Sequence, residues 1–107
     1  MDIEVLVVPG CPHRAAAVAL VREVVDDLRL SGTPVRVGVI DSPAEARRRR
    51  FPGSPTILLD GVDPFARPGQ TAGVACRLYQ TDSGVSWLPD KPALRRALSE
   101  AATGRSE

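Results

Sequence analysis

Cys11 stands between two stretches with different hydrophobic patterns. Before it, the apolar run from Ile3 to Val8 predicts a strand that ends at Pro9-Gly10. After it, Pro12 suits the first position of a helix, because proline has no N–H that would need a partner there. Cys11 is therefore expected at a helix N-terminus, where the helix dipole favours a thiolate, the form that acts as nucleophile or metal ligand. The alternative is a small cysteine buried at the end of a strand.

The remaining metal-binding residue types are sparse. Cys76 is the second of only two cysteines, and the chain has one histidine, His13. No Cys-x-x-Cys pair occurs, so neither a disulfide scaffold nor a closed structural zinc site is expected, and no cofactor is expected.

The 107 residues allow one domain, expected over residues 1–102, with a frayed C-terminus at 103–107. The net charge of +1 implies no general attraction to nucleic acid. The run Arg47–Arg50 is interpreted as a solvated helix end, since four successive residues cover all sides of a helix. No apolar run is long enough to span a membrane, and no signal segment is recognised, so a cytoplasmic protein with reduced thiols is expected.

The hydrophobic periods and turn residues predict alternating strands and helices. The helix after Pro12 is expected to reach Leu30 and to end with Gly32 as its cap. A single long crossover to the next strand implies a parallel pair. The further expected elements are a strand at 35–40, a short helix capped by Ser42, a strand at 56–59, a loop at 61–73, a strand at 74–79, a short extension at 85–87 and a helix after Asp90.

In this order, Cys11-Pro12-His13-Arg14 resembles the Cys-Pro-His-Cys active site of the thioredoxin superfamily, with Arg14 in place of the last cysteine. Ser54-Pro55-Thr56 resembles the cis-proline segment of the same superfamily. The resemblance covers residues 2–101. It implies catalytic roles for Cys11, Pro12, His13, Arg14 and Pro55, and substrate binding by Ser54 and Thr56.

The resemblance also implies an α/β, thioredoxin-like fold: a four-stranded mixed sheet in the order β-α-β-α-β-β-α, with helices on both faces. The third strand would run antiparallel to the first and pair with the fourth as a hairpin. The Ser54-Pro55 bond would be cis, with Pro55 against the Cys11 region. The core is expected to contain Val5, Val7, Val21, Val25, Val37, Val39, Ile57, Leu59 and Leu94.

Three functions remain open. The first is a thiol-dependent redox protein that acts by thiol–disulfide exchange on a protein or low-molecular-weight thiol partner. Arg14 cannot resolve a mixed disulfide, so Cys76 or an external thiol must do so. Arg14 either stabilises the thiolate by its charge or is a solvent-facing helix residue. Cys76 falls in the middle of its predicted strand, so Cys11 and Cys76 are expected not to be bonded.

The second function is the binding or cleavage of a soft metal or organomercurial species, with Cys11, Cys76 and Asp63 as ligands. The stretch from Phe51 to Phe65, followed by Cys76-Arg77-Leu78-Tyr79, is similar to proteins labelled alkylmercury lyase-like. The third is a non-catalytic interaction module on a thioredoxin-like fold. The oligomeric state stays open.

Overall fold

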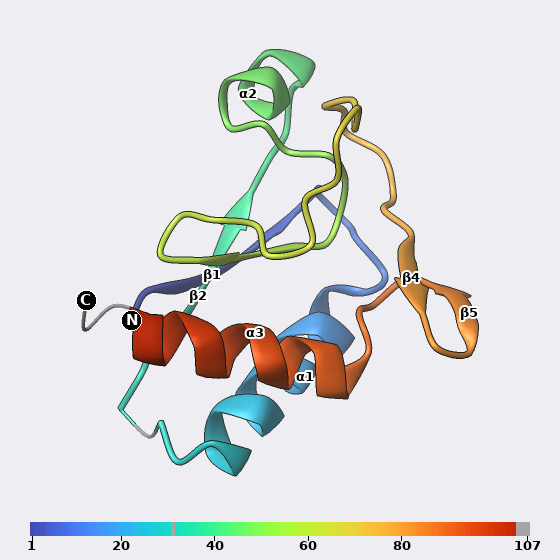
Figure 1. Cartoon of the computed structure of the whole chain (residues 1–107). Coiled ribbons are helices and arrows are strands. Elements are labelled where there is room, and N and C mark those ends of the chain that lie inside the picture. The colour runs from blue at the N-terminus through green and yellow to red at the C-terminus, as the bar shows by residue number, and fades with distance from the viewer. Residues whose placement is uncertain (31, 105–107) are drawn as a thin grey trace.

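The computed structural model of the chain describes residues 1–30 and 32–104. A small mixed sheet lies at its centre, with β1 (Ile3–Val7) between β2 (Val35–Val39) and β3 (Thr56–Leu59) (Figure 1). β1 runs parallel to β2 and antiparallel to β3, as expected. Val5 pairs with Val37 on one side and with Ile57 on the other. No membrane-length apolar helix occurs in the described ranges.

Alternating side chains of β1 divide the core into two clusters. The larger cluster lies on the face covered by α1 (Arg14–Asp27) and α3 (Lys91–Gly104), where Val5 is fully buried against residues such as Val21 and Leu94. The smaller cluster joins Leu6 to Ala46 of α2 (Pro43–Arg48) and to Phe51 on the opposite face. The expectation of helices on both faces is therefore confirmed.

One expected core residue is exposed. Val39 retains 46% of its accessible surface, because β2 is an edge strand of the sheet and Val39 is its last residue. Val37 is partly buried against the larger cluster. The remaining expected core positions are buried: Val5, Val7, Val21, Val25, Ile57, Leu59 and Leu94.

The helix ends differ from those expected for α1. Its last helical residue is Asp27, and Arg29 takes the left-handed conformation at φ +56°. The N–H groups of Arg29 and Leu30 donate to the carbonyls of Asp26 and Val25, which forms a Schellman motif. The helix therefore closes on an arginine before the expected Gly32 cap. Ser31 lies outside the described residues.

The other two helices begin where the sequence predicts. Ser42 caps α2 by accepting the N–H of Glu45 at 3.2 Å. α3 begins directly after Asp90, although the carboxylate of Asp90 accepts the N–H of Asp82. Residues 103 and 104 continue α3, and residues 105–107 of the segment expected to be frayed lie outside the described part of the chain.

The predicted four-stranded sheet is wrong. β4 (Tyr79–Thr81) and β5 (Gly84–Ser86) form a separate two-stranded sheet, visible as the hairpin on the right of Figure 1. β3 does turn back at Asp60-Gly61, but only Leu59 and Val62 pair across that turn. Next to them, Asp63 accepts the N–H of Phe65, and Pro64 has no N–H to donate to a ladder. The hairpin therefore stops after one pair of residues.

Candidate functional site

The Cys11 turn follows the end of β1. Cys11 donates its N–H to the carbonyl of Val8 at 3.2 Å, and its carbonyl accepts the N–H of Arg14 at 3.3 Å. Gly10 allows this turn with a φ of +70°. The helix begins at Arg14 with His13 as its N-cap, so Cys11 precedes the cap by two residues. The prediction that Pro12 opens the helix is therefore wrong, because the chain makes one more turn after the strand.

Ser54 joins this turn to the Ser54-Pro55-Thr56 segment. Its hydroxyl accepts the N–H of Val8 at 3.1 Å, three residues before Cys11. The hydroxyl takes this role because both backbone groups of Ser54 bond elsewhere, to Ala75 and Arg77. The Ser54-Pro55 bond is cis, as expected from the resemblance. Two segments more than forty residues apart thus meet at one end of the sheet.

The segment around Cys76 is placed differently from the predicted fourth strand. Ser54 donates to the carbonyl of Ala75 at 2.8 Å and accepts the N–H of Arg77 at 2.9 Å, so Ser54 and Cys76 form a parallel bridge. The predicted strand at 74–79, antiparallel to the third strand, is therefore wrong. The segment forms only the isolated bridge between Cys76 and Ser54, and β4 begins at Tyr79.

Both thiols are free, as expected, with Cys11 half-buried and Cys76 exposed. Ser54 bridges to Cys76 and also accepts the N–H of Val8. The predicted outcome of two unbonded thiols is confirmed, although Cys76 lies in an isolated bridge and not in the predicted strand.

A buried arginine, which sequence reasoning missed, holds the long loop in place. The guanidinium of Arg77 donates to Asp63 at 2.7 Å, to Thr56 Oγ1 at 3.2 Å and to the carbonyl of Phe65 at 2.8 Å. The Arg77 side chain is 3% exposed and that of Asp63 is 12% exposed. An arginine in the middle of an apolar run is a sequence signal for such a buried pair, since buried charges require partners.

Thr56 and Tyr79 complete this network beside Pro55. Thr56 donates its hydroxyl to the carbonyl of Gly53 at 2.6 Å. The Tyr79 hydroxyl donates to the carbonyl of Pro55 at 2.5 Å, and the Arg77 guanidinium lies 4.4 Å from the centre of the Tyr79 ring. Burial raises the pKa of the Tyr79 phenol well above its usual value. Ser54, Pro55 and Thr56 are all buried, and both hydroxyls of the segment are already bonded within the protein.

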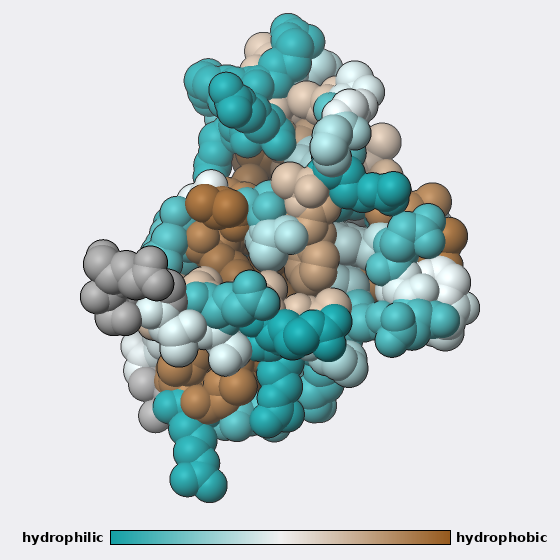
Figure 2. Space-filling view, in the orientation of Figure 1, coloured by the Kyte–Doolittle hydropathy of each residue, from teal (hydrophilic) through white to brown (hydrophobic). Residues whose placement is uncertain are grey.

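The β4–β5 hairpin also reaches the Cys11 turn. The ring of Trp87 stacks on His13 with centroids 5.1 Å apart and an interplanar angle of 15°. Trp87 is 44% exposed, and Val85 and Leu78 are exposed nearby in sequence. Figure 2 shows mostly hydrophilic and intermediate surface over the hairpin on the right, apolar surface just above it, and hydrophilic surface over much of α2 at the top. Sequence reasoning gave Trp87 no role at the site.

A groove with a volume of about 570 Å³ opens beside Cys11 along α1. Val18 and Val37 supply apolar lining, and Arg14 and Arg22 supply positive charge. Pro12 and Arg14 are exposed and His13 is half-buried. The thiol of Cys11 therefore belongs to a surface that a small molecule or an extended segment could contact.

The alternative metal ligands do not form a cluster. Asp63 is paired with Arg77, and residues 1–30 and 32–104 contain no group of three or more His, Cys, Asp or Glu side chains placed to hold a metal ion. The structure therefore does not bring Cys11, Cys76 and Asp63 together as one site.

Comparisons with protein-family models, with curated proteins and with solved structures give no match.

Proposed function

We propose that this chain is a thioredoxin-like, thiol-dependent redox protein in which Cys11 carries out thiol–disulfide exchange. The observation that carries the proposal is the 3.1 Å bond between the Val8 N–H and Ser54 Oγ. It places the Cys11 turn and the cis Ser54-Pro55 segment together, and these are the two segments that resemble thioredoxin active sites.

The reaction needs two exchange steps. The Cys11 thiolate attacks one sulfur of a substrate disulfide, so a mixed disulfide with Cys11 forms and the other sulfur leaves as a thiolate. An external low-molecular-weight thiolate then attacks the substrate sulfur of the mixed disulfide. A new external disulfide forms, and the Cys11 thiolate is released for the next cycle.

The residues around Cys11 have separate roles in this scheme. Arg14 places a positive charge at the start of α1, within the groove that also contains Cys11. Pro12 and the turn hydrogen bonds fix the position of the Cys11 backbone. Cys76 does not take part in the resting arrangement, because Ser54 stands between it and the Cys11 turn.

The proposal is tested with bis(2-hydroxyethyl) disulfide and intact-mass spectrometry. We expect a mixed disulfide on Cys11 in the wild type and in Cys76→Ser, and none at that position in Cys11→Ser. The same reaction in denaturant gives the intrinsic reactivity of Cys11. Adduct formation should be faster in the folded protein, and added glutathione should release the adduct.

Two results would overturn the proposal. One is a folded-state rate at Cys11 no faster than that in denaturant, which would favour the non-catalytic interaction module. The other is an intramolecular loss of two hydrogens after mild oxidation, with neither cysteine alkylated afterwards under denaturing conditions. That result would make Cys76 the resolving thiol.

A further inference from the structure

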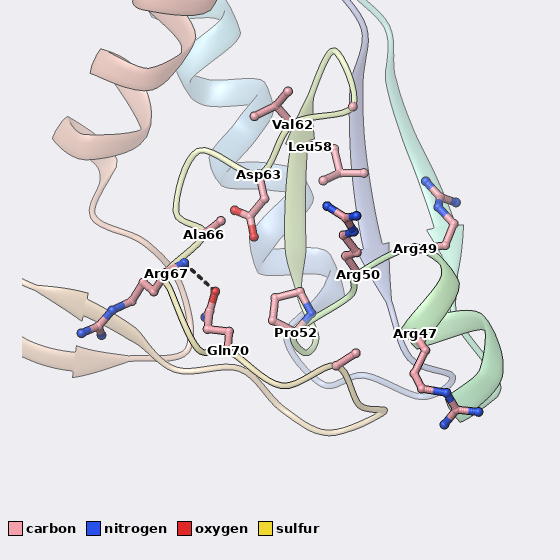
Figure 3. Close-up of a pocket in the computed structure, with 12 residues that line it drawn as sticks. Arg47, Arg49, Arg50, Pro52, Leu58, Val62, Asp63, Ala66, Arg67 and Gln70 are labelled. Atoms are coloured by element: carbon pink, nitrogen blue, oxygen red, sulfur yellow. Dashed lines mark hydrogen bonds between the residues drawn. The ribbon is translucent and has the colours of Figure 1, made fainter.

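A second groove lies away from Cys11, between the end of α2, β3 and the loop that follows β3 (Figure 3). Its volume is about 480 Å³, which falls in the range of small-molecule sites, about 300–1,000 Å³. Pro52, Leu58 and Val62 give it apolar walls, and Val62 is 63% exposed. Apolar surface is therefore open to a ligand there.

Positive charge predominates in the lining of this groove. Arg47, Arg49, Arg50 and Arg67 contribute to it, and Asp63 is the single acidic residue of the lining. The carboxylate of Asp63 is already taken by the buried arginine of the loop.

Among the described residues, one of these four arginines has an acidic partner. Arg49 pairs with Glu4 at 2.9 Å. Within the described residues, Arg47, Arg50 and Arg67 form no ion pair. The groove therefore carries surplus positive charge next to apolar surface.

The backbone of Arg50 is held by the turn that ends α2. It takes the left-handed conformation at φ +51°, in a Schellman motif that closes α2. The next residue, Phe51, is fully buried and donates its N–H to the carbonyl of Ala46 at 2.8 Å. In Figure 3 the Arg50 side chain extends toward Leu58, whereas Arg47 and Arg67 point outward from the groove.

We propose that this groove binds an organic carboxylate with an apolar body. The guanidinium of Arg50 would hold the carboxylate, because its fork of N–H donors matches two carboxylate oxygens. The apolar body would lie against Leu58 and Val62. Arg47 and Arg67 raise the local positive potential and so favour the encounter. Part of the run Arg47–Arg50 thereby gains a role beyond a solvated helix end.

Glycine substitutions provide a matched test. Arg50 and Arg29 both occupy the left-handed position of a Schellman motif, and only Arg50 lines the groove. Glycine is the preferred residue at that position, so both Arg50→Gly and Arg29→Gly should fold and melt no lower than the wild type. Each variant loses one positive charge, so a general charge effect would appear equally in both.

Octanoate, octan-1-ol and octylammonium are titrated into each protein by calorimetry. We expect octanoate to bind wild type and Arg29→Gly with affinities equal within about twofold, and Arg50→Gly about tenfold more weakly or worse, since a charge-assisted hydrogen bond is lost. Octan-1-ol and octylammonium should bind the wild type about tenfold more weakly than octanoate.

The proposal is overturned if octanoate does not bind the wild type at millimolar concentration, or if Arg50→Gly binds it as tightly as Arg29→Gly does. Equal affinity for octan-1-ol would likewise overturn it, because the groove would then select only for an apolar body. Cys11 is not part of this groove, so these outcomes are independent of the redox proposal.

Discussion

The guanidinium of Arg77 lies 2.7 Å from the carboxylate of Asp63, and the two side chains are almost completely buried. Because the same guanidinium also bonds Thr56, this pair ties the loop after β3 back to the first residue of that strand. Arg77, in the middle of the apolar run at 74–79, therefore anchors the loop between β3 and β4. This loop is the longest described segment without a helix or strand.

Replacing Asp63 by alanine should destabilise the protein strongly, because Arg77 would be left buried without a counter-charge. Removal of one partner of a buried pair costs about 3–5 kcal/mol. Urea unfolding followed by circular dichroism measures the loss. The exposed pair between Arg36 and Asp2, at 2.8 Å, is the control. Arg36→Ala should change the free energy of unfolding far less, and an equal loss in the two variants would contradict the assignment.

The Tyr79 phenol should make stability fall at high pH. Its pKa is raised in the folded state by burial, so the unfolded state loses this proton first as pH rises. The stabilisation from the neutral phenol is therefore complete below a pH of about 10 and declines above it. Since Tyr79 is the sole tyrosine, its ultraviolet absorbance reports the ionisation directly. We expect tyrosinate to appear together with unfolding, and the alkaline decline to be smaller in Tyr79→Phe. A phenol that ionises in the fully folded protein near its ordinary pKa would refute this.

Gly53 should not tolerate a side chain. It has a φ of +148°, and a β-carbon there would lie 2.9 Å from the β-carbon of Arg77 and 3.1 Å from the carbonyl oxygen of Ala75. Gly53→Ala should therefore cost about 2 kcal/mol or more, because of backbone strain and the close approach of two segments. Gly73→Ala is the matched control, since a β-carbon there meets nothing within 4 Å. Similar melting temperatures for the two variants would rule out this close approach.

The stack between His13 and Trp87 should couple the β4–β5 hairpin to the Cys11 turn. A double-mutant cycle with His13→Ala and Trp87→Ala measures that coupling in the free energy of unfolding. Aromatic pairs contribute about 0.5–1.5 kcal/mol beyond their buried area, and we expect the low end of that range for this half-exposed pair. Strict additivity of the two single changes would show that the rings do not interact in solution.

Much of the sheet could be predicted from local pattern. The apolar runs that contain Val5 and Ile57 read directly as strands, and the crossover length fixed the parallel pair. The run from Val74 to Tyr79 was wrongly predicted to be a strand of the main sheet, and its burial pattern shows why. Arg77 is buried there, while Leu78 is 55% exposed, so the inward and outward positions contradict the apolar pattern.

The residues of the candidate site could be predicted only where they belong to a short sequence motif, namely the Cys11 turn and the Ser54-Pro55-Thr56 segment. Pro55 was expected against the Cys11 region, and the bond that the structure shows links the neighbouring Ser54 to Val8, three residues before Cys11. The bonds of Arg77 to Thr56 and of Tyr79 to Pro55 link residues more than twenty positions apart. Contacts of this kind depend on how the loop is folded, which no local period encodes.

The bond between Ser54 and Val8 has a consequence for how the protein can change over evolution. Pairing along β1 and β3 uses backbone groups, which every residue except proline retains whatever its side chain. The link to the Cys11 turn instead depends on one hydroxyl. Substitution by threonine preserves a hydroxyl at this position, whereas alanine or valine leaves the Val8 N–H without its acceptor. The hydrogen bonds of the strand pairing therefore do not require particular side chains, whereas the bond between the two motifs can be lost by a single codon change at Ser54.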